Sequence, residues 1–197
     1  MLQIRYIGWV LGIQQFFTSI NRMHAMAYNV HATQTSNNDL QPASGLPGGG
    51  EDAGLSAARQ QAITDGLPYA GGIAPAEAWR LVQDGLAILV DVRTAEERKF
   101  VGYVPETVHV AWMTGTSMNR NPRFVKELEA KVKDKSAVIL FLCRSGKRSA
   151  AAAEAATKAG FGSAFNILEG FEGDLNPAQQ RGQLGGWRLH ALPWVQD

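Results

Sequence analysis

The chain of 197 residues contains a single cysteine, Cys143. One cysteine cannot form an intramolecular disulfide and cannot supply a zinc cluster built from several cysteines. The four histidines, His24, His31, His109 and His190, are scattered and lack the spacing of metal ligands. We therefore expect no metal and no other cofactor.

The sequence also has almost no excess of positive over negative charge, and it has few long apolar runs. The formal net charge of +1 gives no electrostatic reason for binding nucleic acid or an acidic membrane surface. The apolar segment at residues 6–17 is interrupted by Gln14 and Gln15, and it is too short to span a bilayer. We therefore expect no nucleic-acid partner and no stable membrane insertion.

The N-terminal residues 1–22 allow two interpretations. A basic residue, an apolar stretch and the Ala-Met-Ala sequence at residues 25–27 weakly imitate a secretory signal, which would make the protein periplasmic or exported. The polar interruption instead favours translation from Met23 or Met26 and a cytoplasmic protein. N-terminal sequencing of the protein made from its native gene separates the two, since a start at Tyr28 would mean cleavage and export.

The composition changes along the chain. Residues 29–54 are rich in Asn, Ser, Gly and Pro and have no apolar periodicity, which is typical of a linker. Residues 55–66 could form one short helix that ends at Gly66. We predict a leader and flexible extension over residues 1–68, disordered in large part, and one folded domain over residues 69–197.

Strand-like and helix-like segments alternate in the second part of the chain. The unbroken apolar runs predict strands, and the amphipathic or alanine-rich runs predict helices. Strands are predicted at 86–93, 107–112, 136–143 and 163–168, and helices at 74–85, 121–135 and 149–160, with a short helix starting at the capping-box pair Thr94 and Glu97. This alternation favours an α/β fold of three layers, with a central parallel sheet of about five strands and helices on both faces.

The segment CRSGKRS follows the most apolar predicted strand and begins with Cys143. If it wraps a pocket at a helix N-terminus, backbone N–H groups and the helix dipole face the pocket centre. Gly146 permits the unusual dihedral angles of a tight cradle, and the cations Arg144, Lys147 and Arg148 add positive charge. These features favour a reactive thiolate. An inert buried cysteine has about equal support from the residues alone.

Five segments, in this order, resemble the rhodanese family of single-domain sulfurtransferases. They are LVDVRTAEER (89–98), FVGYVPETVHVAW (100–112), CRSGKRS (143–149), NILEGFEG (166–173) and the closing GGW…LPW (185–194). Tyr103 stands where the family usually has histidine. The resemblance covers roughly residues 70–196 and implies the three-layer rhodanese-like fold.

The resemblance also implies roles for individual residues. Cys143 is the expected catalytic residue. The substrate-binding active loop is expected to comprise Arg144, Ser145, Gly146, Lys147, Arg148 and Ser149. Asp91 would support the loop by hydrogen bonds and Arg93 would pair with Glu96 or Glu97, although a purely structural ion-pair network is an equal alternative.

The length of this loop bears on the substrate. Six residues run from Cys143 to Arg148, which the family associates with a pocket for sulfur, whereas the related phosphatases have seven. The resemblance implies transfer of sulfane sulfur from a small anionic donor such as thiosulfate, through a Cys143 persulfide, to cyanide, a thiol or a protein acceptor. The alternatives are a sulfur-carrier or partner-binding module without turnover and, less favoured, a phosphatase or arsenate reductase. We make no prediction of the oligomeric state.

Other conspicuous residues receive structural interpretations. For Trp112, Trp187 and Trp194, core packing is favoured over a role in the pocket wall. His109 is expected to be a satisfied core histidine. The insertion at 113–123 is either a tolerated surface loop or an element for partner specificity.

Two acidic residues lie in the segment that follows the last predicted strand. Glu169 and Glu172 resemble residues that shape the pocket in the family. No catalytic role is predicted for either of them.

Overall fold

The computed structural model describes residues 51–196. Its helices are α2 (Ala53–Asp65), α3 (Pro75–Gln83), α4 (Ala95–Val101), α5 (Phe124–Lys131) and α6 (Lys147–Lys158). Its strands are β1 (Gly71–Ile73), β2 (Ile88–Asp91), β3 (Val108–His109), β4 (Met113–Thr114), β5 (Asn119–Arg120), β6 (Ile139–Leu142) and β7 (Ala164–Ile167). The predictions for the leader, the alternative start sites and most of the linker lie outside the described residues.

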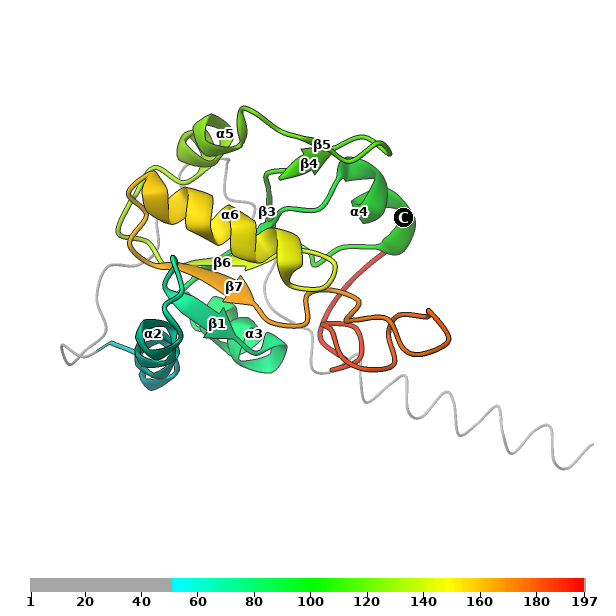
Figure 1. Cartoon of the computed structure of the whole chain (residues 1–197), viewed down its shortest axis with the longest axis horizontal. Helices are drawn as coiled ribbons and strands as arrows, with labels where there is room; N and C mark the ends of the chain where they lie inside the picture. Colours follow the sequence, from blue (N-terminus) through cyan, green and yellow to red (C-terminus); the bar gives the residue numbers. More distant parts are fainter. Residues whose placement is uncertain (1–50, 197) are drawn as a thin grey trace, which may run out of the picture. The chain divides into compact units, whose positions relative to one another are not determined.

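Five of the strands form one sheet in the order β1-β7-β6-β2-β3, and every neighbouring pair is parallel. Figure 1 labels β1, β7, β6 and β3 of this sheet. The predicted α/β fold with a central parallel sheet is therefore confirmed. Strand β1 was not predicted, because its sequence Gly-Gly-Ile is too short and too rich in glycine to give an apolar signal. It joins the sheet through backbone pairing with β7.

Strand β6 lies at the centre of the sheet and divides its side chains between two cores. Ile139 and Phe141 pack in the cluster that contains α5 and α6, whereas Leu140 and Leu142 pack in the cluster that contains α2 and α3. Successive residues of a strand point to opposite faces, so the unbroken apolar run is what a strand covered on both faces requires. By the same alternation Cys143 falls on the face that α5 and α6 cover.

Helix α6 lies along one face of the sheet (Figure 1). It packs against the sheet through small side chains. Ala152, Ala153 and Ala156 are fully buried there. Because alanine projects only one methyl group, the helix axis can approach the strands closely. This close approach fixes the position of the helix N-terminus beside the end of β6.

Helix α2 belongs to the folded part of the chain, although it precedes the boundary predicted at residue 69. Its Leu55 and Ala58 are buried in the cluster that contains α3, and Arg59 donates hydrogen bonds to the carbonyl oxygen of Gly162 (3.0 Å) and to Ser163 Oγ (2.6 Å). The helix ends at Gly66, as predicted, with a left-handed φ of 64°. The folded structure therefore begins earlier than the sequence indicated.

The insertion at 113–123 forms a short antiparallel hairpin of β4 and β5. The Arg120 guanidinium lies 3.2 Å from the centre of a Trp112 ring, and the Asn121 N–H donates to the Trp112 carbonyl oxygen (2.9 Å). These contacts anchor the hairpin to the domain. Whether the hairpin recognises a partner stays a prediction.

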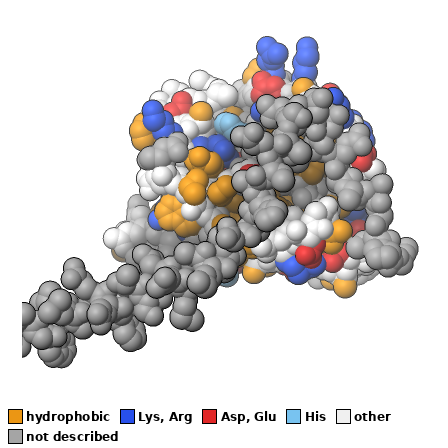
Figure 2. Space-filling view, turned by 180° about the vertical axis from the view of Figure 1, so that it is seen from behind, with side chains coloured by type: hydrophobic (Ala, Val, Ile, Leu, Met, Phe, Trp, Pro, Cys, Tyr) orange, Lys and Arg blue, Asp and Glu red, His pale blue; other side chains and the backbone are white. Residues whose placement is uncertain are grey.

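Charged side chains of both signs are interspersed on the face shown in Figure 2, among the residues that the structure describes. This pattern agrees with the near-zero net charge of the chain. Within residues 51–196, no helix has both the length and the apolar character that crossing a bilayer requires.

Candidate active site

Cys143 directly follows β6 and is 1% exposed. Helix α6 begins at Lys147, two residues before the predicted start, because Gly146 turns the chain into the helix at once. Gly146 has a φ of 85°, in the left-handed region that favours glycine. Only residues 144–146 therefore separate the cysteine from the helix.

The N-terminus of α6 carries an unusual charge distribution. Its first turn contains no acidic residue but does contain Lys147 and Arg148. The first N–H groups of a helix have no partner within the helix, and the dipole makes this end positive. Each cation placed there destabilises the helix by roughly 0.3–1 kcal/mol. The combined positive potential suits an anion at the neighbouring Cys143.

Ser149 contacts the cysteine directly. Its hydroxyl donates a hydrogen bond to Cys143 Sγ over 3.1 Å, and both residues are buried. A donor held in this position stabilises a negative charge on sulfur. The sequence predicted Ser149 as a loop member, and the structure places it within the first turn of α6, beside the thiol.

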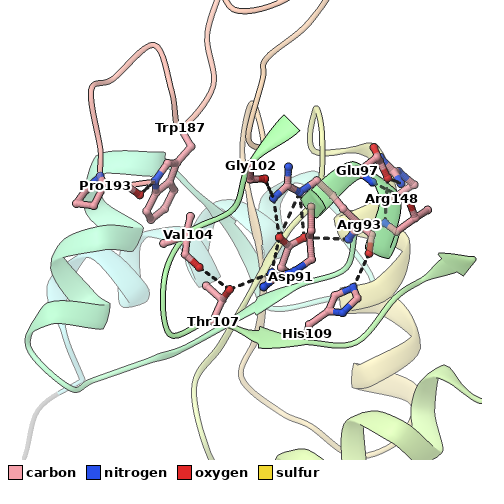
Figure 3. A network of polar contacts seen from close by, with 12 residues as sticks. Asp91, Arg93, Glu97, Gly102, Val104, Thr107, His109, Arg148, Trp187 and Pro193 are labelled. Carbon is pink, nitrogen blue, oxygen red and sulfur yellow. Dashed lines mark hydrogen bonds and ion pairs between the residues drawn. The ribbon is translucent and has the colours of Figure 1, made fainter. Parts of the chain in front are cut away.

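Arg148 is held by Glu97 of helix α4 (Figure 3). The two guanidinium nitrogens donate to the two carboxylate oxygens over 2.7 and 2.6 Å, and the side chains are 12% and 15% exposed. Burial alone would raise the pKa of Glu97, but hydrogen bonds from Arg148 and from the Thr94 N–H outweigh it and lower that pKa. Burial likewise opposes the charged form of Arg148, yet the Glu97 carboxylate raises its pKa. Arg148 is therefore an anchor for the helix N-terminus.

Glu97 also completes the predicted capping box. Its carboxylate accepts from the Thr94 N–H (3.0 Å), while the Thr94 hydroxyl accepts from the Glu97 N–H (3.2 Å). One carboxylate thus caps α4 and binds Arg148 of α6. The capping-box spacing was the sequence signal for this residue, but the spacing does not reveal the second contact.

The predicted pairing of Arg93 with Glu96 or Glu97 is wrong. The fully buried Arg93 donates from Nη2 to Asp91 Oδ2 (2.7 Å) and to the Gly102 carbonyl oxygen (2.9 Å). Residues two apart in an extended segment project to the same side, which brings Asp91 and Arg93 together. Glu97 instead turns toward α6.

Asp91 belongs to a network of ion pairs, and Figure 3 shows its contact with Arg93. Its side chain accepts from Arg93 and from Arg98 Nη1 (2.9 Å), and no hydrogen bond joins it to the loop within the described part of the chain. Burial raises the pKa of Asp91, but the charges of Arg93 and Arg98 outweigh this and lower it. The structural alternative for Asp91 and Arg93 is therefore the one that the contacts favour.

Segment 169–173 packs against the back of the active loop. The Phe171 N–H donates to the Cys143 carbonyl oxygen (2.7 Å), and the Glu172 N–H donates to that of Arg144 (2.9 Å). A Cβ added to Gly170 would lie 2.6 Å from the Cys143 carbonyl oxygen. Glu169 braces this segment, since its carboxylate accepts from the Gly186 N–H over 2.7 Å.

The remaining predicted residues take different positions. Arg144 and Lys147 are exposed beside the buried Cys143, and Ser145 is half-buried between them. His109 is half-buried and Nε2 contacts the Arg93 carbonyl oxygen (2.8 Å), with a pKa lowered by burial. The histidine is satisfied, as predicted, but it is half-buried and lies outside the two core clusters.

The three tryptophans do not share one environment. Trp112 and Trp187 are buried in the two cores, as predicted. The half-buried Trp194 packs its edge against Phe171 and lines a cavity.

Residues 74–176 match the family described as Rhodanese-like domain. The chain belongs to this family. The M. tuberculosis protein Rv0390, known from a crystal structure, is 43% identical, with a TM-score of 0.60 over 66% of this chain and 99% of that one. The RP600 homolog of Rickettsia rickettsii is 39% identical over 115 residues, which are 58% of this chain and 87% of the relative.

A second rickettsial relative, RP600 of Rickettsia prowazekii, is 36% identical over the same length. The match to the solved structure agrees with the fold of the described residues. The rhodanese-like domain accordingly includes the active loop, α4 and the segment that backs the loop.

Proposed function

We propose that this rhodanese-like protein is a sulfurtransferase that carries sulfane sulfur on Cys143. The observation that carries the proposal is the environment of the thiol: it lies at the positive N-terminus of α6 and receives a hydrogen bond from Ser149. A donor hydrogen bond and a helix dipole both stabilise a thiolate and the persulfide anion that replaces it. The family membership supports this chemistry.

The proposed reaction has two steps. The Cys143 thiolate attacks the outer sulfur of thiosulfate, a new S–S bond forms, and the original S–S bond breaks so that sulfite leaves with the electron pair. In the second step a nucleophile attacks the outer sulfur of the persulfide. If the nucleophile is cyanide, it takes the outer sulfur and is released as thiocyanate. If it is a thiol, the thiol becomes a persulfide. In both cases the S–S bond of the enzyme breaks and the Cys143 thiolate is regenerated.

The loop cations divide into two roles in this proposal. The exposed Arg144 and Lys147 attract the anionic donor from solvent. Arg148 uses both terminal nitrogens on Glu97 and therefore orients the helix N-terminus. The six-residue spacing from Cys143 to Arg148 supports a sulfur substrate over phosphate.

The test combines mass spectrometry and kinetics on the full chain. After thiosulfate treatment we expect one added sulfur atom on Cys143, and thiocyanate production when cyanide is supplied. Cys143→Ser should show neither. A wild-type protein that gains no sulfur from thiosulfate or a polysulfide, or that hydrolyses an aryl phosphate instead, would overturn the proposal.

A further inference from the structure

A cavity of about 320 Å³ lies between the segment after β7 and the C-terminal stretch. Its lining residues are Glu172, Arg181, Gly182, Arg188, Leu189 and Trp194. None of them belongs to the active loop at 143–149. The volume corresponds to roughly ten water molecules at ~30 Å³ each, which suits a small organic molecule.

Within the part of the chain that the structure describes, the charged side chains that line this cavity form no ion pairs. Among residues 51–196, neither Arg181 nor Arg188 has a carboxylate within 4.0 Å, and the Glu172 carboxylate has no cationic partner. Arg181 Nη1 donates one hydrogen bond to the Gly173 carbonyl oxygen (2.5 Å). Arg181, Arg188 and Glu172 together give the cavity lining a net charge of +1. One monoanion would neutralise this charge, whereas a dianion would leave an excess negative charge.

Leu189 and Trp194 give the cavity an apolar lining that is partly open to solvent. Leu189 is 49% exposed, and the half-buried Trp194 ring holds the Arg188 guanidinium 4.4 Å from its centre. The Trp194 ring is supported by an edge contact with Phe171, with ring centres 6.1 Å apart. A ligand with an apolar body would cover Leu189 and remove its surface from water.

We propose that this cavity binds a small organic monocarboxylate with an apolar body. The planar carboxylate contacts the guanidinium groups of Arg181 and Arg188, which match it in shape and charge. The apolar body lies against Leu189 and Trp194. Glu172 disfavours dianions, so the cavity selects monocarboxylates over inorganic sulfate.

The cavity is separate from the proposed chemistry at Cys143, yet its wall is continuous with the back of the active loop. The Glu172 N–H donates to the Arg144 carbonyl oxygen (2.9 Å), and the Glu172 carbonyl oxygen accepts from the Gly182 N–H (2.8 Å). Glu172 therefore connects the two sites through its backbone. The binding itself requires no sulfur transfer and can be tested without it.

The test is isothermal titration calorimetry of the full chain with benzoate, its neutral analogue benzamide, and sulfate. We expect saturable one-to-one binding of benzoate, with benzamide and sulfate at least ten-fold weaker. Arg188→Gln should weaken benzoate at least ten-fold, because it removes one of the two guanidinium groups that line the cavity. Arg123→Gln, at the exposed arginine that directly precedes α5 and is remote in sequence from the cavity, should leave the affinity unchanged.

A second variant tests the binding independently, in case Arg188→Gln changes the shape of the cavity. Leu189→Glu introduces a negative charge at an exposed position and should also weaken benzoate at least ten-fold. The proposal is overturned if benzoate does not saturate, if benzamide or sulfate binds equally well, or if both variants retain wild-type affinity.

Discussion

At the scale of single residues, the candidate site places its charges where they oppose the stability of the helix. Lys147 and Arg148 stand at the positive end of α6, and Glu97 compensates only Arg148. The remaining positive potential lies beside Cys143. A buried sulfur anion gains from this potential, and the Ser149 hydroxyl adds a directed hydrogen bond.

The contribution of that hydrogen bond can be measured with Ser149→Ala. The substitution removes the donor 3.1 Å from Cys143 Sγ but keeps a small side chain in the buried position. Since a hydrogen bond to a charged group contributes about 1.5–3 kcal/mol, we expect the rate of persulfide formation from thiosulfate to fall roughly ten- to hundred-fold. Stopped-flow measurement of sulfite release provides the rate.

The matched control is Ser56→Ala, which changes an exposed serine on α2. It should retain the wild-type rate. A Ser149→Ala protein that is folded and transfers sulfur as fast as the wild type would show that the hydroxyl does not assist the thiolate.

At the scale of elements, the position of the active loop depends on the segment behind it. Gly170 has a φ of 67°, and a Cβ there would lie 2.6 Å from backbone atoms of Cys143, Arg144 and Ser145. These atoms belong to the loop backbone, so the contact cannot be relieved by rotating a side chain. The loop itself would have to move.

Gly170→Ala therefore tests the close approach, and Gly115→Ala is its matched control. Gly115 has the same φ of 67°, but a Cβ there meets nothing within 4 Å. We expect Gly115→Ala to destabilise the protein by about 1–2 kcal/mol through backbone strain alone. Gly170→Ala should destabilise it by more and should also slow sulfur transfer.

Urea denaturation gives the free energies of unfolding of both variants, and sulfite release gives their rates. Equal destabilisation by the two substitutions, with equal rates, would mean that the loop tolerates the displacement. Because both glycines have the same φ, the difference between the two variants excludes the shared backbone strain and reports the steric contact at Gly170 alone.

Several of the helices and strands could be predicted from the sequence alone. The apolar runs that contain β2 and β6 predicted buried parallel strands, because short apolar runs rich in branched residues are typical of strands covered on both faces. The Thr94 and Glu97 spacing predicted the start of α4. These signals are local, so the sequence alone contains them.

The features that sequence reasoning missed depend on contacts between distant segments. Arg148 and Glu97 are 51 positions apart, and their pairing depends on where α4 and α6 meet. Strand β1 exists only because β7 offers backbone partners. Glu172 and Arg188 line one cavity, and no spacing in the sequence connects these two residues.

At the scale of the whole molecule, the buried Asp91 and the half-buried Glu97 link stability to pH. The pKa values of Asp91 and Glu97 are lowered in the folded state by their arginine partners, which outweigh the opposing effect of burial. A depressed pKa in the folded state means that the unfolded chain binds protons first as the pH falls. The stabilisation is complete above roughly pH 5 and is lost as the pH falls through the unfolded pKa values near 4 and below.

Glu97→Gln isolates one part of this dependence. Glutamine can still accept the Thr94 N–H in the capping box, but it carries no charge that titrates beside Arg148. We expect a lower free energy of unfolding at pH 7 and a shallower decline between about pH 5 and pH 3 than in the wild type. Urea titrations over a pH series measure both quantities.

Glu154→Gln is the matched control, because Glu154 pairs with Lys158 at an exposed position on α6. Such a pair contributes less than about 1 kcal/mol, so this variant should follow the wild-type curve closely. If Glu97→Gln showed the same slope as the wild type, the Glu97–Arg148 pair would not be the source of acid sensitivity. The proposed anchoring of the α6 N-terminus would then lose its energetic basis, because a carboxylate that binds Arg148 in the folded state must resist protonation there.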